Sequence, residues 1–171
     1  MAKAASPVPA GFHTIIPQLT LDDAAQAIDW YKRALGATEV SRGLGPDGKI
    51  MHAEIVIGNS HFFVNDTMMG LKGPQALGGS PASFWLYVTD SDALFKRAVE
   101  AGAAVQMPMD NQFWGDRAGS IADPAGYSWW IATRKEDLTH DEIQERAGGL
   151  QADGRSADGW LTRPRSRHSA R

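Results

Sequence analysis

Apolar and polar positions along the chain follow the same succession of periods twice. In each copy a strand-like alternation leads to an acidic position, a helical stripe of apolar residues and then a glycine. The first helix is expected to begin near Asp22 and stop at Gly36, and the second to begin near Asp90 and stop at Gly102. Aspartate is a favoured N-cap and glycine a favoured residue after a helix. The chain therefore contains an internal repeat.

Strand-like runs surround each predicted helix, one before it and three after it. The expected strands, in chain order, are 13–19, 38–44, 50–57, 60–66, 83–88, 104–109, 116–122 and 127–133. This order predicts an α+β fold of two βαβββ modules, a first at 12–67 and a second at 82–134. A Gly-rich linker at 68–81 is expected to join them.

The two ends of the chain lack the pattern of the modules. Residues 1–11 are rich in Ala and Pro and are expected to form a flexible leader. Residues 135–148 are expected to carry a short C-terminal helix. Residues 149–171 are rich in Gly, Ser, Arg and Asp, which predicts a disordered, mildly basic tail.

Composition narrows the classes of function. The chain has 171 residues, a net charge of -3 and no cysteine, which excludes disulfides, zinc–thiolate sites and thiol nucleophiles. Since no basic block interrupts the modules, nucleic acid is not an expected partner. No run is apolar enough to predict a membrane span. A chain without cysteine fits a reducing compartment, so we expect a cytoplasmic protein.

Several short motifs carry a resemblance to a known family. They lie at 17–23, 30–37, 45–54, 77–80, 112–117, 123–127 and 131–137. The most specific is Phe113-Trp-Gly-Asp-Arg, whereas Asp123-Pro-Ala-Gly is common in many proteins. On these motifs the chain resembles the vicinal-oxygen-chelate superfamily, within it the PhnB-like branch of glyoxalase and bleomycin-resistance proteins. The resemblance extends over residues 12–147 and implies two modules that enclose one small-molecule pocket, the cup.

The resemblance also implies where a metal would be held. Family enzymes bind a divalent ion through four strand positions that point into the cup. Those positions fall here on Ile16, Phe63, Ser83 and Trp130. None is a good metal ligand, since such sites use imidazole and carboxylate groups. We therefore expect no cofactor and an aromatic cup for a small organic molecule.

A polar wall of the cup follows from strand alternation. A two-residue turn at Gly58-Asn59 pairs Ile55 with Phe62 and turns the other face of this hairpin toward the cup. That face carries His52, Glu54, His61, Phe63 and Asn65. It predicts His52 and Glu54 as catalytic groups that move protons. As alternatives, His52, Glu54 and His61 hold a divalent metal, or the face is solvated and contains a Glu–His hydrogen bond.

The second hairpin is expected to supply the remaining ligand contacts. Pairing across Asp123–Gly126 sets Gly119 opposite Trp130 and Arg117 opposite Ala132, on the cup side. Arg117 is then a third candidate catalytic residue, placed to bind a carboxylate or phosphate, with an ion pair to Asp116 or Glu54 as the alternative. The expected ligand-binding residues are Phe63, Asn65, Ser83, Trp85, Tyr87, Trp114 and Trp130.

Three functions remain open from the sequence. The first is a bleomycin-resistance-like protein that binds a small molecule without the usual metal. The second is a metal-dependent lyase, isomerase or dioxygenase that uses His52, Glu54 and His61. The third is a regulatory or interaction protein with Trp114 and the linker at an interface. The resemblance implies a homodimer in each case.

Overall fold

The computed structural model describes residues 6–152 and contains both βαβββ modules. Module 1 consists of β1 (Gln18–Leu21), α1 (Ala24–Leu35), β2 (Thr38–Leu44), β3 (Ile50–Ile57) and β4 (Ser60–Asp66). Module 2 consists of β5 (Ser83–Tyr87), α3 (Ser91–Glu100), β6 (Ala104–Asn111), β7 (Asp116–Ala122) and β8 (Ser128–Arg134). The predicted α+β fold is confirmed.

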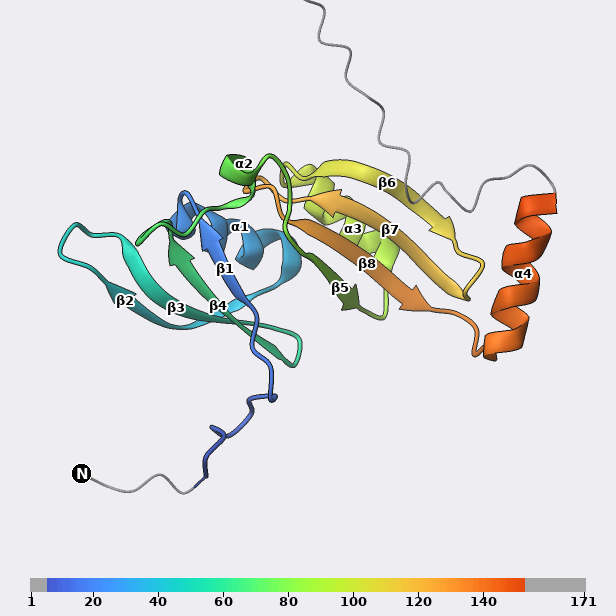
Figure 1. The fold of residues 1–171 in the computed structure, drawn as a ribbon, viewed down its shortest axis with the longest axis horizontal. Coiled ribbons are helices and arrows are strands. Elements are labelled where there is room, and N and C mark those ends of the chain that lie inside the picture. The colour runs from blue at the N-terminus through green and yellow to red at the C-terminus, as the bar shows by residue number, and fades with distance from the viewer. Residues whose placement is uncertain (1–5, 153–171) are drawn as a thin grey trace, which may run out of the picture.

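Each module forms its own four-stranded sheet, in the orders β1-β4-β3-β2 and β5-β8-β7-β6. The strand before each helix pairs in parallel with the last strand of its module, and the other pairs are antiparallel. In Figure 1 the sheet of module 1 lies at the left and that of module 2 at the right. Within the described residues, no helix combines the length and apolar character needed to cross a bilayer.

Some predicted boundaries are wrong. β1 begins at Gln18 rather than at residue 13, and Pro17 directly before it cannot donate a backbone hydrogen bond. The N-cap of α1 is Asp23, not Asp22, and its side chain accepts from the backbone N–H of Gln26 at 2.9 Å. Asp90 caps α3 as expected.

The linker and the C-terminal region also differ from expectation. The linker contains a short helix, α2 (Pro74–Leu77), that the Gly-rich composition concealed. The C-terminal helix, α4 (His140–Ala152), continues past residue 148 and stands at the far end of module 2 (Figure 1). The rest of the predicted tail lies outside the described residues.

The two hairpins test the predicted strand registers. In module 1, Ile55 pairs with Phe62 and Ala53 with Val64, as the two-residue turn predicts. In module 2 the register is shifted by one residue, so that Gly119 pairs with Ile131 and Arg117 with Thr133. The loop holds three residues closed by Asp123 and Tyr127, which pair through their backbones at 2.9 Å, with Gly126 at φ 97°. This shift places Arg117 on the opposite face from Trp130.

The modules pack against each other through their helix-bearing faces. Phe62 of module 1 contacts Phe84 and Trp129 of module 2, with ring centroids 5.7 and 5.9 Å apart. The indole N–H of Trp30 donates to the carbonyl of Ala101 at 2.9 Å. One apolar core therefore spans both modules. Along each strand, the residues next to these rings point to the opposite face of the sheet. The two predicted walls of the cup therefore face away from each other within one chain.

Candidate ligand-binding faces

The outward face of module 2 carries four aromatic rings and one buried carboxylate that accepts hydrogen bonds from two of them. We call it the tryptophan face, and it consists of Trp85, Tyr87, Trp114, Asp116 and Trp130. Trp85 and Trp130 are partners in the β5–β8 register, and their rings stack 4.7 Å apart at 3°. Tyr87 and Trp114 extend the cluster, with centroids 6.2 and 6.3 Å from that of Trp85. Trp85 is 40% exposed and Tyr87 56%. Such a surface offers flat apolar area with fixed ring orientations.

The buried side chain of Asp116 orients two of these rings through hydrogen bonds. The hydroxyl of Tyr87 and the indole N–H of Trp114 both donate to its Oδ2, at 2.8 and 2.9 Å. The carboxylate is 3% exposed, so both hydrogen bonds are shielded from water. Although much of the Tyr87 ring is exposed, desolvation of its partly buried hydroxyl raises its pKa, and the hydrogen bond to Asp116 and the Asp116 charge raise it further. The phenol therefore stays neutral and continues to donate.

The outward face of module 1 is polar, and we call it the histidine face: Gln18, His52, Glu54, His61, Phe63 and Asn65. A Glu54 carboxylate oxygen lies 2.7 Å from Nδ1 of His61, and each side chain is about one-sixth exposed (16% and 17%). The His52 ring meets that of Phe63 edge to face, at 4.7 Å. Glu54, His61 and Phe63 are therefore brought together as predicted, with His52 beside them.

Asn65 lies on the histidine face but is only 2% exposed. Its amide accepts from the side chain of Gln18 at 2.7 Å and donates to the carbonyl of Asp66 at 2.8 Å. The bond from Gln18 ties β1 to β4. Asn65 therefore has a structural role in strand pairing, and its contact with a ligand stays a prediction.

Arg117 does not belong to either outward face. Its guanidinium forms two hydrogen bonds with Asp92 of α3, at 2.8 and 3.1 Å, on the helix-bearing side of the sheet. Hydrogen bonding to Arg117 lowers the pKa of the Asp92 carboxyl. The predicted role of Arg117 in the cup is therefore wrong, and so are both predicted ion-pair partners. The cause is the one-residue register shift of the β7–β8 hairpin.

The four positions that the family uses for a metal do not fit one here. Phe63 and Trp130 occupy equivalent strand places, Ser83 is exposed at the start of β5, and Ile16 precedes β1 altogether. Their side chains supply one hydroxyl and no imidazole or carboxylate. Nor do any three His, Asp or Glu side chains of residues 6–152 gather closely enough to hold an ion. The alternative set of His52, Glu54 and His61 is therefore not assembled as a metal site.

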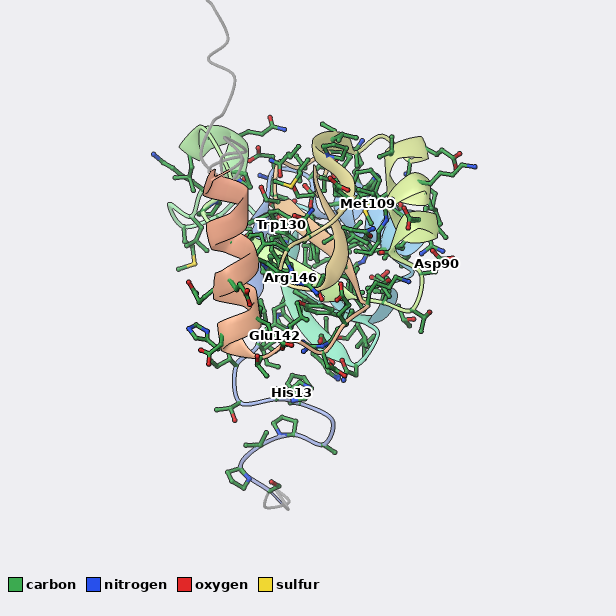
Figure 2. The ribbon with its side chains drawn as sticks, turned by 90° about the vertical axis from the view of Figure 1, so that its right-hand side faces the viewer. His13, Asp90, Met109, Trp130, Glu142 and Arg146 are labelled. Atoms are coloured by element: carbon green, nitrogen blue, oxygen red, sulfur yellow. The ribbon has the colours of Figure 1, made fainter. Side chains whose placement is uncertain are left out.

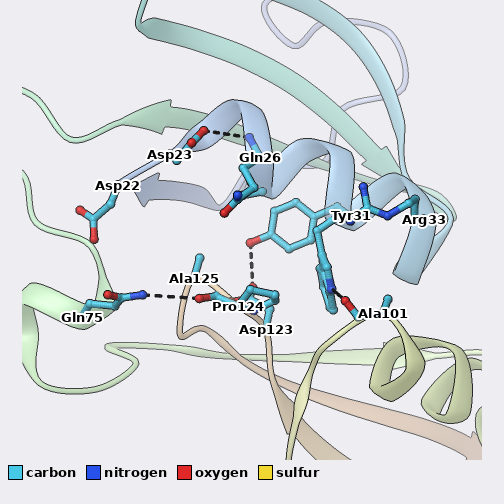
Figure 3. Close-up of a pocket in the computed structure, with 12 residues that line it drawn as sticks. Asp22, Asp23, Gln26, Tyr31, Arg33, Gln75, Ala101, Asp123, Pro124 and Ala125 are labelled. Atoms are coloured by element: carbon cyan, nitrogen blue, oxygen red, sulfur yellow. Dashed lines mark hydrogen bonds between the residues drawn. The ribbon is translucent and has the colours of Figure 1, made fainter.

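A cavity of about 260 Å³ lies elsewhere, between α1 and the β7–β8 turn (Figure 3). Its polar groups already serve the fold: the Tyr31 hydroxyl donates to Oδ2 of Asp123 at 2.8 Å, and Trp129 donates to the same atom at 2.9 Å. Burial raises the pKa of Tyr31 well above its ordinary value, and Asp123 adds to this. None of the predicted site residues lines this cavity. We assign it to the joint between the modules.

The sequence is similar to a known protein family and to proteins of other organisms. The sequence profile of the glyoxalase/bleomycin resistance protein/dioxygenase superfamily matches residues 12–131. The chain belongs to this superfamily. An uncharacterized protein of Mycobacterium bovis is 43% identical over 143 residues, which is 81% of this chain and 93% of that protein. The superfamily expected from the motifs is confirmed.

Solved structures agree with this assignment. TioX from Micromonospora sp. ML1 is 26% identical, with a TM-score of 0.58 over 74% of this chain and all of that one (100%). A bleomycin-binding protein in complex with bleomycin has a TM-score of 0.52 and 20% identity, over 73% of this chain and 99% of that one. At this identity the second likeness concerns the fold alone.

Two site residues were missed by the sequence reasoning. Asp116 appeared only as a possible partner of Arg117, although its place beside Trp114 on an alternating strand puts it under the tryptophan face. Phe12 was placed at the very start of the first module, outside any predicted strand and with no role, yet its ring stacks on His61, with centroids 4.5 Å apart. No local signal predicts that second contact, because it joins residues far apart in sequence.

Proposed function

We propose that this protein binds a small planar organic molecule on its tryptophan face, without a metal. The observation that carries the proposal is the parallel stack of Trp85 on Trp130 at 4.7 Å, at the surface and braced by Asp116. Indole faces favour flat and cationic groups, through stacking and through their negative electrostatic potential. The bleomycin complex of a protein with the same fold is consistent with such a ligand.

We further propose that the binding protein is a homodimer. Within one chain the tryptophan and histidine faces point in opposite directions, because Phe62, Phe84 and Trp129 fill the space between the modules. A second copy related by a two-fold axis would set the tryptophan face of one subunit against the histidine face of the other, twice. Light scattering across protein concentrations tests this arrangement, and a monomer throughout would contradict it.

Calorimetric titration with bleomycin tests the ligand site. We expect Trp85→Ala to weaken binding about thirtyfold, since losing a stacked, partly desolvated ring costs about 2 kcal/mol. Leu77→Ala is the matched control, because Leu77 is also an exposed apolar residue (52%) but lies in α2. Circular dichroism checks that each variant is folded. Equal affinities of the two variants for bleomycin would count against the site.

A second candidate function is metal-free acid–base catalysis by the histidine face. It is favoured by the 2.7 Å contact between Glu54 and His61, which orients the ring and leaves Nε2 as the group to exchange a proton. Glu54→Gln would then abolish turnover of a bound carbonyl compound while leaving its affinity unchanged. If turnover survives in both Glu54→Gln and His61→Ala, catalysis by this pair is excluded.

The interaction function has less support. Trp114 packs on Trp85 and donates to Asp116, so its ring belongs to the tryptophan face. In the proposed dimer it serves the ligand site as well as the interface. A cytoplasmic location remains part of the proposal, and cell fractionation tests it.

A further inference from the structure

The segment before β1 makes a tight turn against the histidine face. The backbone N–H of Phe12 donates to the carbonyl of Pro9 at 3.2 Å, and Gly11 adopts φ 83°. A positive φ at the third position of a four-residue turn is typical of type II, which favours glycine there. The turn thus has a local cause in the sequence, and it fixes the direction in which Phe12 leaves the segment.

The turn covers His61. The Phe12 ring lies 4.5 Å from the imidazole at an interplanar angle of 26°, and 5.9 Å from the ring of Phe63. A Cβ atom built on Gly11 would lie 3.5 Å from Nε2 of His61. Because Nδ1 faces Glu54, the segment shields the ring nitrogen that would otherwise meet a ligand.

The segment is weakly attached apart from this ring. Among residues 6–152, the hydrogen bonds found for 6–16 stay within the segment, from Phe12 to Pro9 and from Val8 to Ser6. The first bond to the module is at Pro17, whose carbonyl accepts from Phe63 at 2.8 Å. Ile15 is 81% exposed. In Figure 2, His13 lies below the modules, on the segment that leads away from them. Lifting the turn therefore costs mainly the contacts of Phe12.

We infer that Phe12 is a specificity-determining plug: it fills a ring-binding subsite on His61 and Phe63, and a planar ring of the ligand must displace it. The inference rests on the proposed function for its ligand, but the covering of His61 does not. A stacked ring at 4.5 Å takes the place that a flat ligand ring would need. Ligands without such a ring would leave the plug in place.

Acylation of histidines by diethyl pyrocarbonate, followed by peptide mass spectrometry, tests the plug without any ligand. Phe12→Ala should raise the acylation rate of His61 several-fold, relative to exposed His140 in the same molecule. Ile15→Ala is the matched control and should leave the rate unchanged, since the Ile15 side chain in the same segment is 81% exposed. An unchanged His61 rate in Phe12→Ala would overturn the inference.

Titration with bleomycin gives the second readout. Removing a competing stacked ring should tighten binding roughly 2- to 12-fold in Phe12→Ala, and not in Ile15→Ala. Weaker binding in Phe12→Ala would mean that the ring is a wall of the site, which also overturns the plug. If no variant binds bleomycin, that ligand proposal fails, and the acylation rates still decide whether Phe12 covers His61.

Discussion

The two modules share a backbone plan but present different outward faces. Their N-caps, Asp23 and Asp90, lie 67 positions apart (90 − 23), and the same offset relates their paired strand residues. At one such place Gln18 pairs with Phe63, and at the equivalent place Trp85 pairs with Trp130. The same geometry therefore supports a polar wall in one module and a stacked aromatic wall in the other.

The shared features are those that hold the helices. In module 1 the backbone N–H of Ala24 donates to Asp66 at 2.8 Å, and in module 2 the N–H of Ser91 donates to Thr133 at 2.9 Å. Each bond ties the first turn of a helix to the last strand of its module. The two modules therefore share these anchors, whereas their outward side chains differ in character.

The largest expected effect concerns these anchors. Asp66 also accepts from the backbone N–H of Ile50 at 2.7 Å, so Asp66→Ala would leave two buried donors unpaired. The Thr133 hydroxyl also makes a second bond, which it donates to the carbonyl of Val88 at 2.8 Å. We expect Asp66→Ala to lower the free energy of unfolding by about 3 kcal/mol, against about 2 kcal/mol for Thr133→Ala, because hydrogen bonds to a carboxylate are stronger than those of a neutral hydroxyl. Urea denaturation measures both. Equal losses would show that the two anchors are not distinguished by the carboxylate.

The next effect separates the two outward faces. Trp130→Ala should weaken bleomycin binding about thirtyfold, since it removes one of two stacked rings and costs about 2 kcal/mol. Phe63→Ala, at the equivalent place, should weaken it no more than about threefold, because the ring subsite of the histidine face, on His61 and Phe63, is already occupied by Phe12. Calorimetry under identical conditions compares the variants. A larger loss for Phe63→Ala would reverse the roles assigned to the faces.

Much of the fold follows from the sequence because local signals repeat. Aspartate caps, terminal glycines and strand alternation give both modules, and the two-residue turn at Gly58-Asn59 gives the right register for β3 and β4. The same reasoning gives the wrong register for β7 and β8. The three-residue loop between these strands differs from the expected one by a single pairing step, and that step moves Arg117 from the cup side to α3.

The candidate site is less accessible to sequence reasoning for a different reason. Alternation correctly groups His61 with Glu54 and Trp85 with Trp130 within each module. It does not determine how two modules pack. Within one chain the two predicted walls of the cup are not brought together, because the helix-bearing faces are buried against each other in one apolar core and the other faces point outward.

A smaller effect concerns the brace under the tryptophan face. Asp116→Asn removes the negative charge beside Tyr87 and should lower the pKa of that phenol, which burial and Asp116 hold above its ordinary value. Ultraviolet titration of tyrosinate detects the shift. In the native protein the neutral phenol is favoured by folding, so this stability is present below the unfolded pKa and is lost as pH rises through the folded pKa. An unchanged Tyr87 pKa in Asp116→Asn would show that Asp116 does not act on this phenol.

The smallest effect tests whether Arg117 lies outside both faces. Arg117→Gln should leave bleomycin affinity unchanged and lower the free energy of unfolding by less than about 1 kcal/mol, since its partner Asp92 is 57% exposed and the pair is screened by water and salt. The pair lowers the pKa of Asp92, so its contribution is present above the unfolded pKa and is lost as pH falls through the folded value. Urea curves of native and variant protein should therefore converge in acid. A loss of ligand affinity in Arg117→Gln would instead return this residue to the binding site and contradict the register of β7 and β8.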